Sequence, residues 1–324
     1  MQAILAVTVP FFALVLCGWL GARQQVLPDS AIPGLNGYVL YFALPCLLFR
    51  FGASTPVLDL LNPSMLGVYL LAALLVVFVT VATTLGERIG LPDAAFGALV
   101  AAFPNTGFMG VPLLVALLGA AAAGPVICTV LADLFVTSSV CIALAQAHGA
   151  AGQGWRTALA QALRGALSNP LPWAIALGAL FSVTGLRLAG ALAPLGTLVG
   201  MLADSASPVA LFTIGAVLWR TGGHPAGRTP LADYLPLAAI KLFVHPLLVF
   251  LLAAAARRLG APISAFQVMV LTLAAALPSA SNVALLAQRY GADIGRVARI
   301  IMSSTVLAFF SFSLLAFALG VRPR

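Results

Sequence analysis

Ten apolar runs, each close to the length that crosses a lipid bilayer, follow one another along the 324 residues of this chain. A membrane-spanning helix needs about 20 mostly apolar residues. Only 7% of the residues are charged and 62% are hydrophobic, against roughly 25% and 45–50% in soluble domains. Too few charged side chains remain to cover a soluble protein of this size. The sequence therefore predicts an all-α polytopic membrane protein and excludes a soluble enzyme, a disordered chain and a nucleic-acid-binding protein.

Short loops join the expected spans. The longest connection, at 149–168, is too short to form a soluble domain. The N-terminal run has no basic segment before it and no cleavage site after it, so we expect it to be a retained first span. The ten spans are expected at 3–21, 32–52, 64–86, 93–118, 124–147, 169–185, 193–219, 232–256, 264–288 and 295–319.

Arginine placement between the spans predicts how the chain is oriented. With the N-terminus outside, the loops that face the cytoplasm carry nine arginines and the opposite side carries six. Lys and Arg are enriched in the cytoplasmic loops of membrane proteins. We therefore expect both termini outside, because an even number of spans returns the chain to the side where it began. The same excess of arginine explains the pI near 10.0 without nucleic-acid binding.

Prolines recur in the same order in the two halves of the chain. The pairs are Pro45 with Pro208, Pro92 with Pro262 and Pro104 with Pro278, which lie 163, 170 and 174 residues apart. Five spans in each half require the second half to be inverted relative to the first. Inverted repeats with interrupted helices at matching positions are typical of secondary transporters. We expect a first repeat at 1–148, a short cytoplasmic connection at 149–168 and a second repeat at 169–324.

Each half contains one span that its own sequence interrupts. Proline lacks a backbone N–H and clashes with the carbonyl one turn earlier, so small polar residues directly after it favour a break. Freed backbone groups persist at membrane depth only against protein or a water-filled cavity. A broken helix also exposes backbone donors at its new N-terminus, and these attract anions. We predict a substrate site that includes Pro104, Asn105, Thr106, Gly107, Pro278, Ser279, Ser281 and Asn282.

A second interpretation of the same residues needs no ligand. Pro104 and Pro278 would then kink two packed helices, and neighbouring Asn and Ser side chains would satisfy the freed backbone groups. Recurrence of the pattern in both halves favours the binding site, because a kink has no reason to recur at the matching place. Both interpretations stay open at this point.

Three short motifs carry a similarity to known proteins. They are LPCLLF at 44–49, PNTGFMGVPLL at 104–114 and LPSASNVALLAQRYG at 277–291. At these residues the sequence resembles the auxin efflux carrier family, a group of bacterial, fungal and plant carriers that includes the plant PIN-type auxin exporters. The resemblance covers the whole chain, but the plant exporters have a long hydrophilic loop where this chain has a short connection. This difference favours a compact prokaryotic relative in a bacterial cytoplasmic (inner) membrane.

The resemblance implies a fold and a mode of transport. Spans 1, 2, 6 and 7 would form a scaffold, in which Pro45 and Pro208 lie beside the substrate path. Spans 3–5 and 8–10 would form a transport domain in which broken spans 4 and 9 cross, as in an elevator-type carrier. The fold would be similar to that of bile-acid sodium symporters and some sodium/proton antiporters. Family members move organic anions, namely auxin in plants and dicarboxylates such as malate or malonate in bacteria.

Four ionisable side chains are expected well inside spans: Asp133, Asp204, Lys241 and His245. A lone charge in the membrane is costly, so each needs a partner, a wet cavity or neutralisation. Asp133 and Lys241 would lie in the transport domain within direct or one-water contact, either as one pair that couples transport to protons or as a structural ion pair. His245 lies one turn after Lys241 and precedes a proline, which favours a local hydrogen-bond role. Asp204 could cap a break in span 7 or face the substrate path.

The sequence also lacks the signatures of several function classes. It has no HExxH, GxSxG or phosphate-loop motif, so we expect no enzyme. Its three histidines lie on separate segments, so we expect neither a metal site nor a cofactor. We predict a gradient-driven carrier of a small organic anion in the lipid bilayer. A cation-coupled (Na⁺ or H⁺) symporter or antiporter of the related fold and a non-transporting receptor are the alternatives, and a homodimer is left open.

Overall fold

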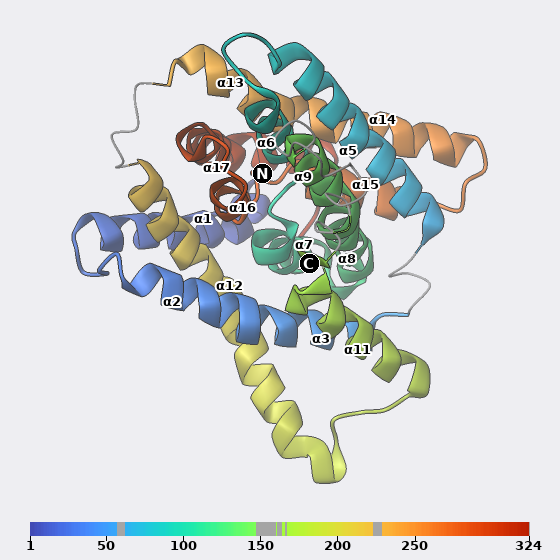
Figure 1. Cartoon of the computed structure of the whole chain (residues 1–324). Helices are drawn as coiled ribbons and strands as arrows, with labels where there is room; N and C mark the ends of the chain where they lie inside the picture. Colours follow the sequence, from blue (N-terminus) through green and yellow to red (C-terminus); the bar gives the residue numbers. More distant parts are fainter. Residues whose placement is uncertain (57–61, 147–159, 161–163, 166, 223–228, 324) are drawn as a thin grey trace.

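The structure, a computed structural model, describes residues 1–56, 62–146, 160, 164–165, 167–222 and 229–323 (Figure 1). These residues are mainly helical, and no β-strand occurs among them. The first half contains α1 (Gln2–Arg23), α2 (Ala31–Tyr38), α3 (Leu44–Ser54), α5 (Pro63–Thr84), α6 (Leu91–Ala102), α7 (Val111–Leu118), α8 (Ala123–Ala132) and α9 (Ser138–Gln146). The second half contains α11 (Pro170–Thr184), α12 (Ala193–Gly222), α13 (Leu231–Ala239), α14 (His245–Arg258), α15 (Ala265–Ala275), α16 (Val283–Arg289) and α17 (Ile294–Ala318). Most of the expected connection at 149–168 lies outside the described residues.

Within the described residues, seven apolar segments are long enough to cross a membrane, in agreement with a polytopic membrane protein. They are Gln2–Arg23, Ala31–Ser54, Pro63–Thr84, Ala120–Gln146, Ala193–Arg220, Leu231–Arg258 and Ile294–Ala318. Each coincides with one of the ten expected spans. The other three expected spans consist of shorter helices: α6 and α7 in span 4, α11 in span 6, and α15 and α16 in span 9. The count of ten therefore stays a prediction.

Three of the long segments are not uniform α-helices. Each contains one π-helical turn, at Val39–Ala43, Asp133–Thr137 and Ile240–Val244. Pro45 and Pro246 lie just after two of these turns, in the first turn of α3 and of α14. A π turn is rare in ordinary helices and frequent at functional sites. Two of the ionisable residues singled out from the sequence, Asp133 and Lys241, lie within such turns.

Two helix pairs pack so closely that their backbones approach each other. α1 lies along α12, and α3 lies along α11. A Cβ atom on Gly18 would overlap the carbonyl oxygen of Phe212, and a Cβ atom on Gly215 would overlap that of Val15. A Cβ atom on Gly178 would lie 2.5 Å from a backbone oxygen of α3. The sequence thus joins these four helices through contacts that only glycine permits.

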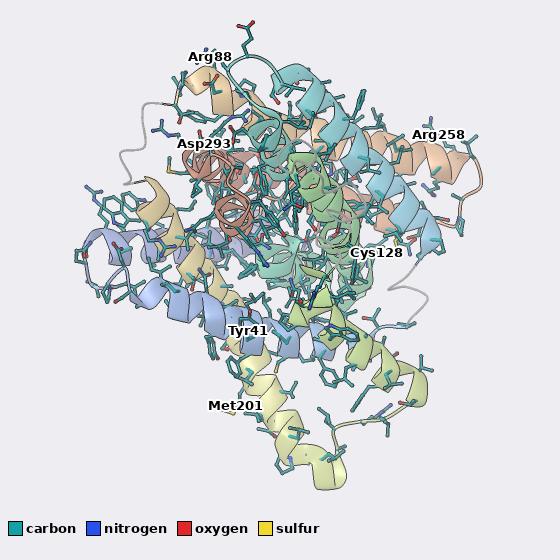
Figure 2. All side chains as sticks on the ribbon, viewed as in Figure 1. Tyr41, Arg88, Cys128, Met201, Arg258 and Asp293 are labelled. Atoms are coloured by element: carbon teal, nitrogen blue, oxygen red, sulfur yellow. The ribbon has the colours of Figure 1, made fainter. Side chains whose placement is uncertain are left out.

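The remaining helices gather around the two interrupted spans. α5 packs against α6 and α14, α6 against α9, and α13 against α17. Most of the buried apolar side chains of these helices and of α1, α3, α11 and α12, the glycine-packed helices, form one large core, and a smaller cluster lies between α5, α8, α14 and α15. The N-terminal half of α12, which carries the exposed Met201, projects away from the rest of the molecule (Figures 1 and 2).

Arg296, in the first turn of α17, holds three helix starts together. It is almost fully buried, and its guanidinium donates to the carbonyl oxygens of Asp93 in α6 and Asp233 in α13, each at 2.9 Å. Gly97 leaves room for this side chain, because a Cβ atom there would lie 3.1 Å from Nη1 of Arg296. Asp293 caps α17 by accepting from the backbone N–H of Arg296 at 3.0 Å. The starts of α6, α13 and α17 therefore meet at one end of the helices that carry the breaks.

Candidate functional site

Both interrupted spans break beside the predicted prolines, and the two breaks meet. α6 ends at Ala102, and α15 ends at Ala275. Directly beyond these ends, Pro104 and Ser279 pair in an isolated antiparallel bridge. The expectation that the helices are interrupted near Pro104 and Pro278 is therefore confirmed, and we refer to the place where the segments 103–106 and 278–282 meet as the crossing.

Two backbone hydrogen bonds join the crossing segments. The N–H of Asn105 donates to the carbonyl oxygen of Pro278 at 2.8 Å, and the N–H of Ala280 donates to that of Phe103 at 3.0 Å. Helix termini and proline breaks leave backbone groups without intrahelical partners. Each broken span supplies partners that the other has lost, so the irregular backbone is tolerated at the centre of the protein.

Ser279 is fixed by the helices around it rather than presented to a ligand. Its hydroxyl donates to the carbonyl oxygen of Val100 in α6 at 2.8 Å. Its backbone N–H donates to the hydroxyl oxygen of Ser304 in α17 at 3.1 Å, and the two hydroxyls are also 3.1 Å apart. Ser304 is a site residue that the sequence analysis missed, because one serine within a long apolar span carries no distinguishing pattern.

Three polar atoms near the crossing have no partner among the described residues. They are Oδ1 of Asn105, Oγ1 of Thr106 and Oδ1 of Asn282, and all three are buried. Buried polar side-chain atoms in folded proteins are usually hydrogen-bonded, so unpaired ones need an explanation such as a ligand, an ion or water. Which end of an Asn amide carries the oxygen is an assignment rather than an observation. The crossing therefore offers amide and hydroxyl groups that can still bind another molecule.

A cavity of about 860 Å³ opens beside the crossing. From the broken spans it is lined by Phe103, Phe108, Ser281 and Asn282. Its other walls include Asn36, Tyr41, Leu134, Ser138, Asn169, Arg220, Arg289 and Tyr290. Asn105 and Thr106 are buried and do not line it. Of the two amides expected to share a cavity, Asn282 therefore lines this one and Asn105 does not. A second cavity, of about 820 Å³, lies at α14 and α15 and contains no crossing residue.

The other residues predicted for the site lie close to this arrangement. Pro278 belongs to the crossing itself, and Gly107 lies in a π turn at Thr106–Gly110 that leads into α7. No heavy atom lies within 4 Å of a Cβ atom built on Gly107, so the turn does not need glycine for space. Pro45 lies in the first turn of α3, and Pro208 lies inside α12, which packs against the π turn at Thr106–Gly110.

Asp133 is fully buried and held by two neutral hydroxyl donors. The hydroxyl of Tyr69 in α5 donates to Oδ2 at 2.8 Å, and that of Thr137 donates to Oδ1 at 3.0 Å. The ring of Tyr69 lies 5.8 Å from the ring of His245. Tyr69 therefore contacts both the carboxyl group of Asp133 and the ring of His245, a role that the sequence did not indicate.

Lys241 has a different partner from the one expected. Its Nζ donates to the carbonyl oxygen of Ala275, the last residue of α15, and lies 3.4 Å from Nδ1 of His245. Ion pairs within 4.0 Å among the described residues do not include Asp133 with Lys241, so the two side chains are not in direct contact, and the one-water contact stays a prediction. Cations are favourable at helix C-termini, where carbonyl oxygens lack partners. Lys241 thus caps α15, the first half of broken span 9. His245 lies within hydrogen-bond distance of Lys241, the local role expected from the sequence, and its Nε2 has no partner among the described residues.

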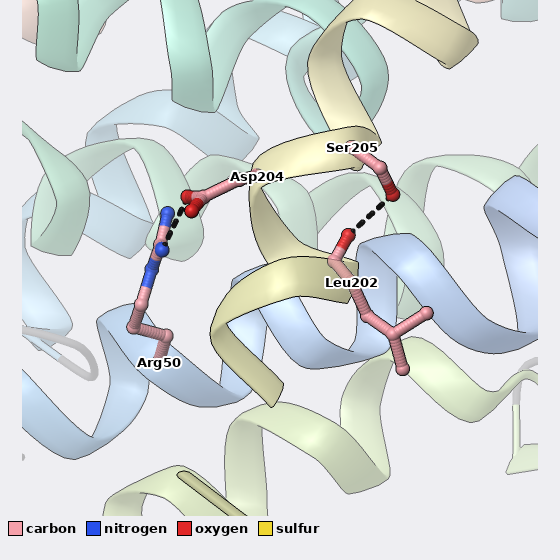
Figure 3. A network of polar contacts seen from close by, with 4 residues as sticks. All are labelled: Arg50, Leu202, Asp204 and Ser205. Atoms are coloured by element: carbon pink, nitrogen blue, oxygen red, sulfur yellow. Dashed lines mark hydrogen bonds and ion pairs between the residues drawn. The ribbon is translucent and has the colours of Figure 1, made fainter. Parts of the chain in front are cut away.

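Asp204 forms an ion pair within the glycine-packed helices. Its Oδ1 accepts from Nη1 of Arg50 at 2.6 Å, and the hydroxyl of the adjacent Ser205 donates to the carbonyl oxygen of Leu202 at 2.7 Å (Figure 3). The Ser205 hydroxyl also lies 2.6 Å from the hydroxyl of Tyr38. α12 continues through Pro208 without interruption. The suggestion that Asp204 caps a break in span 7 is therefore wrong, because the helix has no break there and the carboxylate already has a cationic partner.

Comparison with known proteins agrees with these features. Residues 3–316 match the family described as "Membrane transport protein". The "Putative malonate transporter" of Rhizobium meliloti (strain 1021) is 30% identical over 314 residues, which cover 95% of this chain and 93% of that protein. An "Uncharacterized transporter" of Methanothermobacter thermautotrophicus is 26% identical, with 93% of each chain covered, and "Uncharacterized transporter YfdV" of Escherichia coli (strain K12) is 23% identical, with 87% and 86% covered. The chain therefore belongs to the membrane transport protein family, which includes the auxin efflux carriers, and it is an integral membrane transporter.

Proposed function

We propose that this transporter carries a small organic anion with one or more carboxylate groups, by alternating access and without direct use of ATP. The observation that carries the proposal is the crossing, where unpaired amide and hydroxyl groups lie beside a cavity large enough for a small solute. The Rhizobium meliloti relative, whose name specifies malonate, supports a short dicarboxylate as the first solute to test. A carboxylate only accepts hydrogen bonds, so at the crossing it would accept from the Thr106 hydroxyl and from the NH₂ groups of the Asn side chains, which rotation of the amide can present to it.

The proposal includes an elevator-type mechanism with two inverted five-helix repeats. Gly52 in α3 and Gly215 in α12 both lie at close helix contacts, and they are 163 residues apart, as are Pro45 and Pro208. This agreement supports a first repeat at 1–148 and a second at 169–324. The glycine-packed helices would be the scaffold, and the helices around the crossing would be the moving transport domain.

The proposed orientation places the cavity on the cytoplasmic side of the inner membrane. Asn169, Arg220 and Arg289 line the cavity and lie near chain segments that the arginine distribution assigns to the cytoplasm. With both termini outside, the described conformation would be open inward. Cysteine labelling of single-cysteine variants from each side of the membrane would test this orientation.

Counterflow in proteoliposomes tests the transport function directly. Vesicles containing the purified protein and unlabelled malonate should accumulate external labelled malonate transiently, and protein-free vesicles should not. A panel of labelled mono-, di- and tricarboxylates would then rank the solutes. If no carboxylate exchanged while the protein remained folded, the organic-anion proposal would be wrong.

Cation coupling is the second candidate, and one observation favours it. The unpaired atoms of Asn105, Thr106 and Asn282 are assigned as oxygens, and cations such as Na⁺ are bound by oxygen ligands. The described crossing residues include no carboxylate, which makes a tight cation site less favourable than in a site with acidic ligands. Repeating the uptake measurement with Na⁺ replaced by K⁺ or choline distinguishes the two candidates, because only the second requires Na⁺.

The variant Asp133→Asn tests whether substrate uptake is coupled to protons through Asp133. The substitution keeps the side-chain shape but removes an ionisable group that Tyr69 and Thr137 now hold. We expect uptake to lose its dependence on an imposed pH gradient, while exchange of unlabelled for labelled substrate continues. Tyr69→Phe is the matched control, since it removes one hydrogen bond to Asp133 and leaves the carboxyl group. Proton coupling through Asp133 should be abandoned if pH-driven uptake survives in Asp133→Asn.

A further inference from the structure

The charged side chains that line the cavity beside the crossing all have one sign. Among its described lining residues, Arg220 and Arg289 are charged, and neither Asp nor Glu occurs. A concave surface that bears charge of one sign raises the local concentration of solutes of the opposite sign. The cavity is therefore built for anions along its length and not only at the crossing.

Arg289 lies at a defined distance from the crossing. Asn282 precedes α16 and Arg289 ends it, so the two residues are seven positions apart on one short helix. Seven residues make almost two turns, which puts both on the same face, about 10 Å apart along the axis. Side chains on a helix lean toward its N-terminus, so the long Arg289 side chain is able to reach toward Asn282 across the cavity. Both residues line the same cavity.

Arg289 is an exposed side chain that lies near an aromatic ring and away from acidic groups of the described residues. Its guanidinium lies 5.8 Å from the ring centre of Tyr290, whose ring stacks on Phe96 in α6 with 6.2 Å between centres. Ion pairs within 4.0 Å in the described part of the chain do not involve Arg289. Arg220, from α12, approaches the same cavity from the opposite group of helices.

We propose that Arg289 is the residue that makes this carrier prefer dicarboxylates to monocarboxylates. One carboxylate of the solute binds at the crossing beside Asn282, and the second pairs with the guanidinium of Arg289 at the far end of α16. Arg220 adds a positive charge from the opposite wall. This inference rests on the proposed transport of organic anions and adds the origin of the preference for a second negative charge.

The physical basis is the pairing of a planar guanidinium with a carboxylate. Arginine can donate two parallel hydrogen bonds to a carboxylate, and such charge-assisted bonds are roughly twice as strong as neutral ones. A lysine at the same place would keep the charge but lose this geometry. A solute that ends in a neutral amide gains much less from Arg289 than one that ends in a carboxylate.

The test compares two solutes of nearly the same shape. Malonate carries two carboxylates, whereas malonamate carries one carboxylate and one neutral amide. Half-saturation concentrations for uptake of both would be measured in proteoliposomes for the unchanged protein, Arg289→Gln and Arg289→Lys. Arg258→Gln is the control for net charge, because Arg258 lies at the far end of α14 from α16 (Figure 2).

We expect the Arg289 variants to weaken the uptake of malonate and to leave the uptake of malonamate nearly unchanged. In Arg289→Gln the half-saturation concentration for malonate should rise about tenfold or more, as expected for loss of a charge-assisted pair, while that for malonamate changes by less than about twofold. Arg289→Lys should lie between, and Arg258→Gln should match the unchanged protein. If Arg289→Gln does not fold, Arg289→Lys still tests the inference, because it should raise the half-saturation concentration for malonate and not that for malonamate.

Three results would overturn the inference. Equal use of malonate and malonamate by the unchanged protein would leave anion transport standing but remove the preference to be explained. If the half-saturation concentrations of both solutes rose equally in Arg289→Gln, or if neither rose, Arg289 would not bind the second carboxylate. Absence of uptake for both solutes, with another carboxylate transported, would reject malonate-type dicarboxylates as substrates and the inference with them.

Discussion

Gly215→Leu is expected to prevent stable folding of this transporter. Even a Cβ atom at this position overlaps the carbonyl oxygen of Val15, because α1 and α12 approach backbone to backbone there. A clash with backbone cannot be relieved by a rotamer change, so the two helices must separate. Forcing a larger side chain into a packed core usually costs about 1–3 kcal/mol, and this site lies at the upper end or beyond. Detergent-solubilised protein should show a lower melting temperature or elute as aggregate in size-exclusion chromatography.

The same helix provides the control. Gly200→Leu lies in α12 as well, but no heavy atom lies within 4 Å of a Cβ atom at Gly200. This variant should elute and melt like the unchanged protein. If Gly215→Leu also behaved normally, the close approach of α1 and α12 would be incorrect.

Loss of both crossing amides is expected to reduce substrate affinity strongly. Asn282 lines the cavity, and Asn105 lies behind it with an unpaired carbonyl oxygen. Removing one partner of a buried hydrogen bond costs about 1–3 kcal/mol, which corresponds to roughly 5- to 150-fold in affinity. We expect Asn282→Ala to raise the half-saturation concentration within this range. Asn105→Ala should act in the same direction, and the double variant should reduce uptake below detection.

A third amide in the same cavity serves as the comparison. Asn36 lines the cavity from α2 and takes no part in the crossing. Asn36→Ala should change the half-saturation concentration by less than about threefold, the effect of a single exposed hydrogen bond. Normal transport in well-folded Asn105→Ala and Asn282→Ala variants would contradict the assignment of the crossing as the substrate site.

The positions of the breaks could be predicted from local sequence because proline acts on its own helix. Pro104 and Pro278 each lack a donor and are each followed by small polar residues, so their effect does not depend on distant contacts. Recurrence of the pattern in the second half added the expectation that the breaks meet. The bridge between Pro104 and Ser279 agrees with both steps.

The partners of the ionisable residues could not be predicted in the same way. Sequence position gives the depth of Asp133 and Lys241 along their helices but not the rotation of each helix about its axis. The π turns at both residues change the direction in which the following side chains point, and the apolar sequence contains no pattern that predicts these turns. Tyr69 and the carbonyl oxygen of Ala275 therefore replaced the expected direct pair. The sequence likewise named no partner for Asp204, which pairs with Arg50 of α3.

The bridge at the crossing also bears on how the protein is made. Asn105 and Phe103 leave the ribosome about 170 residues before Pro278 and Ala280, which supply their hydrogen-bond partners. At a synthesis rate of about 5–20 residues per second, that interval is roughly 10–35 s. During it, the N–H of Asn105 and the carbonyl of Phe103 have no native partner, and each unpaired group costs several kcal/mol in hydrocarbon. The first half of the chain therefore cannot complete span 4 alone, and final insertion of that segment must wait until the second half has been synthesised.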